Sequence, residues 1–339
     1  MKNLLKTRQL GRTSLYVTEL GFGSASIGNL YQVCTSAEAE NAVINSWNCG
    51  IRYFDTAPAY GNGLSERRLG DALRRYPQKD YILSTKVGDF LYTVPGKAPP
   101  DTIFIDPLPF YLKYDYSYDG IMRNFEDSLQ RLGLNQVDIL LVHDLDPIIH
   151  QQKTFERYFH SYIDSGYKAL DTLRSQGIIK AIGLGVKKWE VCAEVLKYGD
   201  YDCFMLERNY TLLEQPALEN FLPLCVKKGI SILLAGPFAS GILATGAVQG
   251  AHFHHQEADP QILERVKQIQ HICSDYSVPF QAAAVQFPLF HPAIASVVIG
   301  THSNKRTQEN IAFLHYNIPH QLWDTLKQKG FIPKEAPTT

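Results

Sequence analysis

Short apolar runs alternate with amphipathic segments along most of the chain. The apolar runs predict eight strands, at Glu19–Gly23, Tyr53–Asp55, Tyr81–Lys86, Val137–His143, Ile178–Gly183, Asp202–Leu206, Ile230–Ala235 and Ser296–Ile299. Helical periodicity and glycine stop signals predict helices at Ser36–Asn48, Tyr118–Leu132, Tyr162–Gln176, Glu190–Lys197, Gln215–Lys228, Pro260–Tyr276 and Asn304–Leu314. This alternation indicates the α/β class with parallel strands, and its economical closure is a (β/α)8 TIM barrel.

The whole chain, residues 1–339, fits one barrel domain, because no segment resembles a linker. Residues 1–20 predict a β-hairpin, built from Lys6–Leu10 and Tyr16–Glu19, that plugs the barrel bottom and leads into the first strand. The connections 88–117 and 236–259 are longer than ordinary loops and are expected to cover the site. Residues 318–339 form a C-terminal segment.

A doubly wound sheet is the competing fold, because Gly21, Gly23 and Gly28 loosely resemble a dinucleotide-binding fingerprint. The spacing argues against it. Helical sequence begins only near Ser36, and no acidic residue ends a second strand about twenty residues after the glycines.

Composition narrows the function classes. The chain is 45% apolar and 20% charged with a formal net charge of −1, so no overall field attracts nucleic acid or an anionic membrane. Six cysteines without CxxC pairing are typical of reduced, buried thiols. The charged N-terminus lacks the apolar core of a secretory signal. We expect a cytoplasmic protein that acts on a small molecule and binds neither nucleic acid nor a membrane; the sequence leaves its oligomeric state open.

Reactive side chains stand where successive predicted strands end. Asp55 ends the second strand, Tyr60 lies in the glycine-rich loop that follows, Lys86 ends the third strand and His143 ends the fourth. Each has an ordinary structural explanation: such a lysine usually reaches into water, and such a histidine is often only hydrogen-bonded in the core. Four of them in this order favour catalysis.

This order resembles the catalytic tetrad of the aldo-keto reductase superfamily, and the likeness spans nearly the whole chain. The segments 208–213 (RNYTLL) and 236–243 (GPFASGIL) are most similar to the aldose 1-dehydrogenase branch, which includes threo-aldose, L-fucose and L-galactose dehydrogenases. The resemblance implies a tetrad of Asp55, Tyr60, Lys86 and His143 and a nicotinamide cofactor.

The resemblance also implies binding residues. For the cofactor they are Gly23, Ser24, Phe238, Ser240, Gly241, Gly300, Thr301, His302, Arg306, Glu309 and Asn310; for the substrate they are Tyr60, His143, Phe90 and Tyr92. NAD or NADP is expected, with a slight preference for NAD, because many NADP-using relatives carry a lysine where Gly300 stands. The contacts to the nicotinamide differ from the usual family pattern at Gly185-Val186, Glu207 and Ala235.

The tetrad suits hydride transfer. A tyrosine with an ordinary pKa is a weak base near neutrality, so we expect the Lys86 ammonium, held by Asp55, to lower the pKa of Tyr60. A neutral His143 would hold the substrate oxygen, with the adjacent Asp144 as its partner. No metal is needed, and His252, His254 and His255 crowd one loop without a second pair at the spacing of a zinc site.

The leading hypothesis is therefore an NAD(P)-dependent aldose 1-dehydrogenase that oxidises a sugar hemiacetal to a lactone. A pyridoxal 4-dehydrogenase, or a general aldehyde or ketone reductase with the same tetrad, is the alternative among enzymes. A non-catalytic, nucleotide-binding regulatory subunit is the alternative from another class, and the intact tetrad argues against it.

Overall fold

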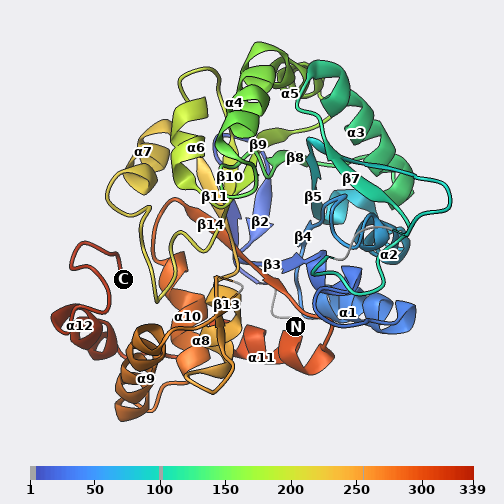
Figure 1. Cartoon of the computed structure of the whole chain (residues 1–339). Coiled ribbons are helices and arrows are strands. Elements are labelled where there is room, and N and C mark those ends of the chain that lie inside the picture. The colour runs from blue at the N-terminus through green and yellow to red at the C-terminus, as the bar shows by residue number, and fades with distance from the viewer. Residues whose placement is uncertain (1–4, 99–101, 255) are drawn as a thin grey trace.

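Eight parallel strands close into a barrel around which the helices are arranged (Figure 1). The structure is a computed structural model that describes residues 5–98, 102–254 and 256–339. The barrel strands are β3 (Leu20–Gly23), β4 (Tyr53–Asp55), β5 (Ile82–Val87), β8 (Ile139–His143), β9 (Ala181–Val186), β10 (Cys203–Glu207), β11 (Ser231–Ala235) and β14 (Ile294–Gly300). They pair in this order and β14 returns to β3, which confirms the predicted TIM barrel and excludes the doubly wound sheet.

The helices cover the outside of the barrel. They are α1 (Ser36–Asn48), α2 (Leu64–Leu73), α3 (Tyr118–Leu132), α4 (Gln152–Ser161), α5 (Tyr167–Ser175), α6 (Trp189–Val195), α7 (Phe221–Lys228), α8 (Ile242–Thr245), α9 (Pro260–Asp275), α10 (Phe280–Leu289), α11 (Asn304–Leu314) and α12 (His320–Gln328). A π-helical segment, η3 (Tyr162–Gly166), joins α4 to α5. In the described part of the chain no helix is long and apolar enough to cross a membrane.

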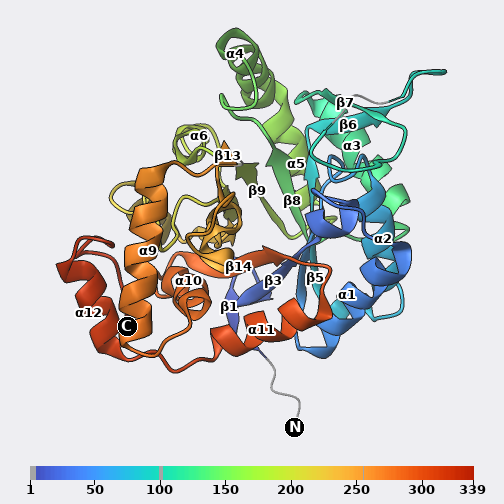
Figure 2. The same ribbon diagram turned by 60° about the horizontal axis from the view of Figure 1, so that its bottom comes forward.

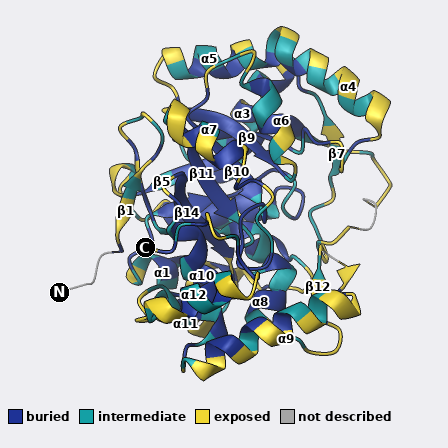
Figure 3. Cartoon of the chain, turned by 90° about the vertical axis from the view of Figure 1, so that its left-hand side faces the viewer, coloured by how far each residue is buried: buried dark blue, intermediate teal, exposed yellow. Residues whose placement is uncertain are grey.

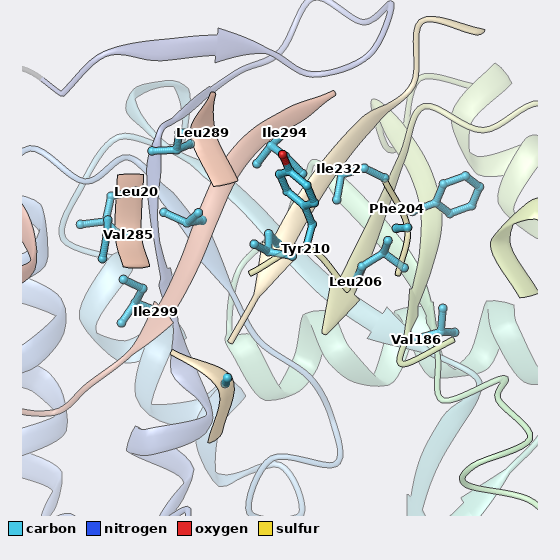
Figure 4. Close-up of a cluster of buried hydrophobic side chains, with 14 of the residues drawn as sticks. Leu20, Val186, Phe204, Leu206, Tyr210, Ile232, Val285, Leu289, Ile294 and Ile299 are labelled. Carbon is cyan, nitrogen blue, oxygen red and sulfur yellow. The ribbon is translucent and has the colours of Figure 1, made fainter. Parts of the chain in front are cut away.

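Burial follows the layers of a barrel. The strands and the inner faces of the helices are buried, and the outer helix faces are exposed (Figure 3). Apolar side chains such as Leu20, Ile232 and Ile294 on the strands and Val285 and Leu289 on α10 belong to the main core (Figure 4). This layer supplies most of the apolar burial that stabilises the fold.

A second, smaller core fills the inside of the barrel. The strands β1 (Thr7–Gln9) and β2 (Tyr16–Thr18) form the predicted hairpin, and Leu10, Leu15 and Val17 pack there against inward residues such as Ile139 and Leu141. The hairpin lies at the opposite end of the barrel from β6 (Asp89–Tyr92), β7 (Tyr111–Tyr114) and α4 (Figure 2). One end is thus plugged, and the other carries the long connections.

Three differences from the predicted elements have physical causes. Strand β9 begins at Ala181, not Ile178, because the backbone N–H groups of Ile178 and Ile179 bond to the Leu173 carbonyl oxygen of α5. Helix α7 begins at Phe221, not Gln215, because the preceding residues form turns. Helix α10 was not predicted, since it is apolar on nearly every face and shows no amphipathic period. Helices α2, α4 and α12 were also not among the predicted ones.

The long connections contain short elements of their own. The first holds the β6–β7 hairpin, and the second holds η4 (Ala239–Gly241), α8, β12 (His252–Phe253) and β13 (Gln256–Glu257). Two further 3-10 turns are η1 (Ser24–Gly28) and η2 (Gln78–Asp80).

Candidate active site

Asp55 and Lys86 form a buried ion pair between neighbouring strands. Because β4 and β5 are parallel and Asp55 pairs with Ser84, the two side chains meet inside the barrel mouth. Lys86 Nζ lies 2.6 Å from Asp55 Oδ1 and donates to the Thr56 carbonyl oxygen at 2.9 Å, and the Ser84 hydroxyl donates to Asp55 Oδ1 at 2.5 Å. The side chains of Lys86 and Asp55 are 1% and 3% exposed. Each charge therefore depends on the other, since an isolated buried charge is strongly unfavourable.

Gly185 on β9 leaves the room that Lys86 needs. A Cβ at Gly185 would lie 3.2 Å from Lys86 Cε and 3.9 Å from His143 Cδ2. His143 is also the direct strand partner of Gly185. The glycine therefore allows the lysine and the histidine to share the mouth.

Tyr60 reaches the same mouth from the loop after β4. The turn residues Gly61 and Gly63 have φ of 63° and 94°, which favours glycine at both positions. The centre of the Tyr60 ring lies 5.6 Å from Lys86 Nζ and 5.9 Å from the centre of the His143 ring. The structure thus brings together all four side chains of the predicted tetrad.

The predicted lowering of the Tyr60 pKa is wrong. Burial raises the pKa of Tyr60 well above its ordinary value, and the carboxylates of Asp55 and Asp144 raise it further. The Tyr60 side chain is partly exposed to solvent. Burial is still the largest cause of its raised pKa, because protein atoms surround it densely. The Lys86 ammonium does not reverse this, because Asp55 pairs with it closely.

His143 has a different partner from the one predicted. Its Nδ1 lies 2.8 Å from Asp89 Oδ2, whereas its Nε2 lies 3.9 Å from Asp144 Oδ1, beyond hydrogen-bonding distance. Asp144 has φ of 52° at the strand end, and the Tyr114 hydroxyl donates to its Oδ2 at 3.4 Å. The hydroxyl of Tyr116 donates to the His143 carbonyl oxygen at 2.8 Å. Asp89 was missed, although it follows the strand that carries Lys86 by only two residues.

The predicted substrate residues Phe90 and Tyr92 lie on the wrong face of the β6–β7 hairpin. Side chains alternate along a strand, so both point away from the face on which Asp89 meets His143. Phe90 lies under the Arg123 guanidinium of α3, at 5.2 Å, and Tyr92 packs against Tyr111.

Phe104, in the first long connection, lies beside Tyr60. Its ring centre lies 5.9 Å from that of Tyr60, and Phe104 is half-buried. Backbone bonds to the loop after β3 hold its segment, from Tyr31 N to the Ile103 carbonyl and from Ile105 N to the Asn29 carbonyl, both 2.9 Å long. The sequence did not show which aromatic residue of this connection would lie beside Tyr60.

The predicted cofactor residues at the C-terminal ends of strands β3 and β14 lie side by side. Gly23 pairs with Gly300, and the exposed Gly300 leads through Thr301 to the N-terminus of α11. The Ser303 hydroxyl caps that helix by accepting from Arg306 N. The side chain of Arg306 is exposed there, His302 bonds with Gln32 at 2.9 Å, and Glu309 pairs with Lys305. Asn310 is buried.

The side chain of Ser24, a predicted cofactor residue, bonds within the protein. It is fully buried, and its hydroxyl lies 2.6 Å from that of Ser65, which fastens the turn after β3 to α2. Its side chain therefore cannot contact a dinucleotide in this conformation. Phe238, Ser240 and Gly241 lie after β11, where Gly241 has φ of 100° and a Cβ there would meet nothing within 4 Å.

A pocket of about 170 Å³ lies between the loops after β9 and β10. Its lining includes Lys187, Trp189, Glu207, Arg208 and His254. Arg208 is buried; its Nη1 donates to the Ser240 hydroxyl, and its Nε has no partner among the described residues. Opposite charges are balanced around this pocket, so it is polar without a strong field.

The three clustered histidines fall in the second long connection. His252 and His254 lie on or beside the β12–β13 hairpin, and His254 Nε2 is 3.1 Å from Glu214 Oε2. His255 lies outside the described residues. No group of three metal-ligating side chains occurs within the ranges that the structure describes.

The geometry agrees with comparisons to known proteins. The family model for the aldo/keto reductase family matches residues 19–330. The chain belongs to the aldo/keto reductase family. It is 40% identical to pyridoxal 4-dehydrogenase of Microbacterium luteolum, over 96% of this chain and 97% of that protein. It is 34% identical to D-threo-aldose 1-dehydrogenase of a Pseudomonas species, over 94% and 96%.

A solved structure shows the same fold. An aldo-keto reductase from Bacillus halodurans, in its holo form, superimposes with a TM-score of 0.74 at 26% identity, covering 99% of this chain and 97% of that one. The predicted family is thus confirmed, and the protein is an oxidoreductase of this family.

Proposed function

We propose that this protein is an NAD(P)-dependent dehydrogenase that oxidises a cyclic hemiacetal to a lactone. The observation that carries the proposal is the convergence of Asp55, Tyr60, Lys86 and His143 at one barrel mouth. A phenol, an imidazole and a buried ion pair around one opening provide acid–base chemistry at a substrate oxygen.

The two named relatives point to one substrate class. An aldose closes on itself when a hydroxyl attacks its aldehyde, and pyridoxal can do the same with its neighbouring hydroxymethyl group. Both therefore present a ring carbon with one hydrogen and one hydroxyl, and removal of a hydride and a proton gives a lactone. Phe104 and Tyr60 would contact the ring face, while Asp144 offers an acceptor for a further hydroxyl.

The side chains divide the work. Tyr60 would take the hydroxyl proton during oxidation and return it during reduction, and His143 would hold the same oxygen. A bound nicotinamide would accept or supply the hydride. Since burial raises the pKa of Tyr60, the phenol would hold its proton near neutrality and could donate it during reduction. Oxidation should accelerate as pH rises, because it needs the phenolate, and reduction should slow.

The chain offers groups that fit a dinucleotide. The glycine pair Gly23–Gly300 leaves the strand ends open, and the N-terminus of α11 presents backbone N–H groups for an anion. The buried Nε of Arg208, which has no partner among the described residues, is a further donor beside the pocket between the loops after β9 and β10. We propose a preference for NAD, because Gly300 provides no cation for a 2′-phosphate, with Arg306 as the nearby cation that could bind one.

The test is a panel of substrates with purified protein and NAD or NADP. Absorbance at the reduced nicotinamide band would be followed for pyridoxal, aldoses with their epimers, and simple aromatic aldehydes. We expect oxidation of pyridoxal or of one aldose, with epimers of that aldose much slower, since an unpaired buried polar group costs about 1–3 kcal/mol. Equal rates across epimers together with fast reduction of simple aldehydes would favour the general aldehyde reductase. Tight cofactor binding without turnover of any compound would favour the regulatory subunit.

A further inference from the structure

Asp89 makes a buried contact with His143 that the four-residue tetrad does not include. Its Oδ2 lies 2.8 Å from His143 Nδ1, and its side chain is fully buried. At this separation Nδ1 carries the hydrogen and the carboxylate accepts it, because an ionised carboxylate has no proton to donate. The contact thus fixes the ring orientation and leaves Nε2 facing the mouth.

The backbone is built to place this carboxylate. Gly88, with φ of 100°, turns the chain between β5 and β6, and a Cβ there would lie 2.4 Å from the Tyr116 ring. Asn124 of α3 donates from its side chain to the Asp89 carbonyl oxygen at 2.8 Å. The turn at Gly88 and the hydrogen bond from Asn124 therefore both fix the backbone of Asp89.

Asp89 also lacks another strong partner. Its Oδ1 is buried and has no hydrogen-bond partner in the described part of the chain. A buried carboxylate is costly unless a positive charge or several donors satisfy it. His143 is the group in contact that can supply that charge, so the pair favours a doubly protonated ring.

The other groups around His143 support the same state. Burial lowers the pKa of His143, but the carboxylates of Asp144 and Asp89 outweigh it and raise the pKa above the ordinary value. Lys86 from β5 opposes them, although Asp55 pairs with it. Tyr60 faces the ring edge, and Tyr116 binds the His143 carbonyl oxygen and His150. The imidazole of His143 thus lies near two carboxylates, and the one nearby ammonium, that of Lys86, is neutralised by Asp55.

We propose that Asp89 is a positioning residue that holds Nδ1–H and keeps His143 doubly protonated, so that Nε2–H donates a hydrogen bond to the substrate oxygen. This role rests on the proposed function. His143 keeps its proton throughout, and the proton that moves is the one on Tyr60. A charged donor stabilises negative charge on the oxygen more than a neutral one does.

The experiment compares wild type with Asp89→Asn and Asp89→Glu. Asp127→Asn serves as the matched control, because Asp127 is an aspartate of α3 that pairs with Arg123 at 3.9 Å. Imidazole ¹⁵N spectra of the ligand-free protein, with the His143 signals assigned by their loss in His143→Asn, report the protonated nitrogen and its titration. Turnover against pH and the affinity for NAD and NADP are measured in parallel.

We expect Nδ1 to be protonated in wild type, and the His143 titration to move to lower pH in Asp89→Asn but to stay near its wild-type position in Asp89→Glu. Turnover should fall by about 10- to 100-fold in Asp89→Asn, the scale known for carboxylate partners of metal-ligating histidines, with cofactor affinity unchanged. Asp127→Asn should behave as wild type. An unprotonated Nδ1 in wild type, or an unchanged titration in Asp89→Asn, would overturn the proposal.

The wild-type spectrum keeps the test decisive if Asp89→Asn does not fold. The spectra also need no substrate, so they separate this proposal from the proposed function. A shifted titration in a protein that oxidises no hemiacetal would remove the function and keep the Asp89–His143 pair.

Discussion

The two sides of the barrel mouth are built in opposite ways. On the side of β4, β5 and β8, charged groups are buried and bonded to one another, as Lys86 is to Asp55 and His143 is to Asp89. On the side of β14 and α11, the chain offers glycines at the strand ends and exposed polar groups such as Arg306. On the first side, the buried charges already have protein partners. On the second side, the exposed polar groups could bind the proposed cofactor.

The contrast has a physical reason. Groups that stabilise changing charge act best when they are fixed before the reaction, because no free energy is then spent on ordering them. A binding surface for a long, charged cofactor must instead stay open, and its polar groups remain solvated until the cofactor arrives. Mutations on the two sides should therefore have different signatures.

The largest effect is expected at Tyr60. Tyr60→Phe should lower turnover by about 10²- to 10⁴-fold, the scale of general acid–base catalysis, because it removes the hydroxyl that moves the proton. Cofactor affinity and the unfolding temperature should change little. Turnover close to wild type would remove Tyr60 from the chemistry and break the distinction between the two sides.

Lys86→Met should damage both activity and stability. It leaves Asp55 buried without its cation, which typically costs about 3 to 5 kcal/mol of unfolding free energy. Urea unfolding monitored by circular dichroism would measure the loss. Adding Asp55→Leu should recover part of the stability and none of the activity, because the uncompensated charge is gone but the catalytic ion pair is not restored. Recovery of turnover in the double variant would contradict the role of the pair.

His291 tests the scaffold on the β14 side through pH. It lies between α10 and β14, its Nδ1 accepts from Ala293 N, and burial lowers its pKa to about 4. Since the unfolded chain binds this proton at higher pH than the folded one, stability should be full above about pH 6.5 and should have fallen by about 3 kcal/mol at pH 4.

The variant His291→Asn keeps an acceptor for Ala293 and should flatten this loss in urea unfolding measured from pH 7 to pH 4. The exposed His271 supplies the control, since His271→Asn should keep the wild-type slope. If His291→Asn lost as much stability between pH 7 and pH 4 as wild type does, a group other than His291 would cause that loss.

The smallest effect is expected at Arg306. If its guanidinium approaches a 2′-phosphate, Arg306→Ala should lower kcat/KM with NADP by about tenfold and leave NAD nearly unaffected, consistent with the loss of one surface phosphate contact. Lys305→Ala is the neighbouring control, because Lys305 already pairs with Glu309. Equal losses with both cofactors would mean that Arg306 serves the shared part of the nucleotide.

The accuracy of the sequence predictions followed the type of interaction. The eight barrel strands were found because each is a short apolar run with its own turn signals, and the largest shift is in β9, which begins three residues later than predicted. Helix α10 escaped because a helix that is buried all round has no polar face. The meeting of the four side chains was predicted because Asp55, Lys86 and His143 stand at strand ends and Tyr60 lies in the loop after one of them, and a barrel brings such positions to one opening.

The sequence by itself determined the barrel, its N-terminal plug and the four reactive side chains, since periodicity and strand ends are local properties of the chain. Tertiary structure alone decided which partners those side chains have. Asp89 meets His143 across 54 residues, Phe104 and not Phe90 lies beside Tyr60, and Ser24 is bonded into the turn after β3. Such pairings depend on how loops fold back and which strand face each residue occupies. They are set by packing between distant segments, to which no local pattern is sensitive.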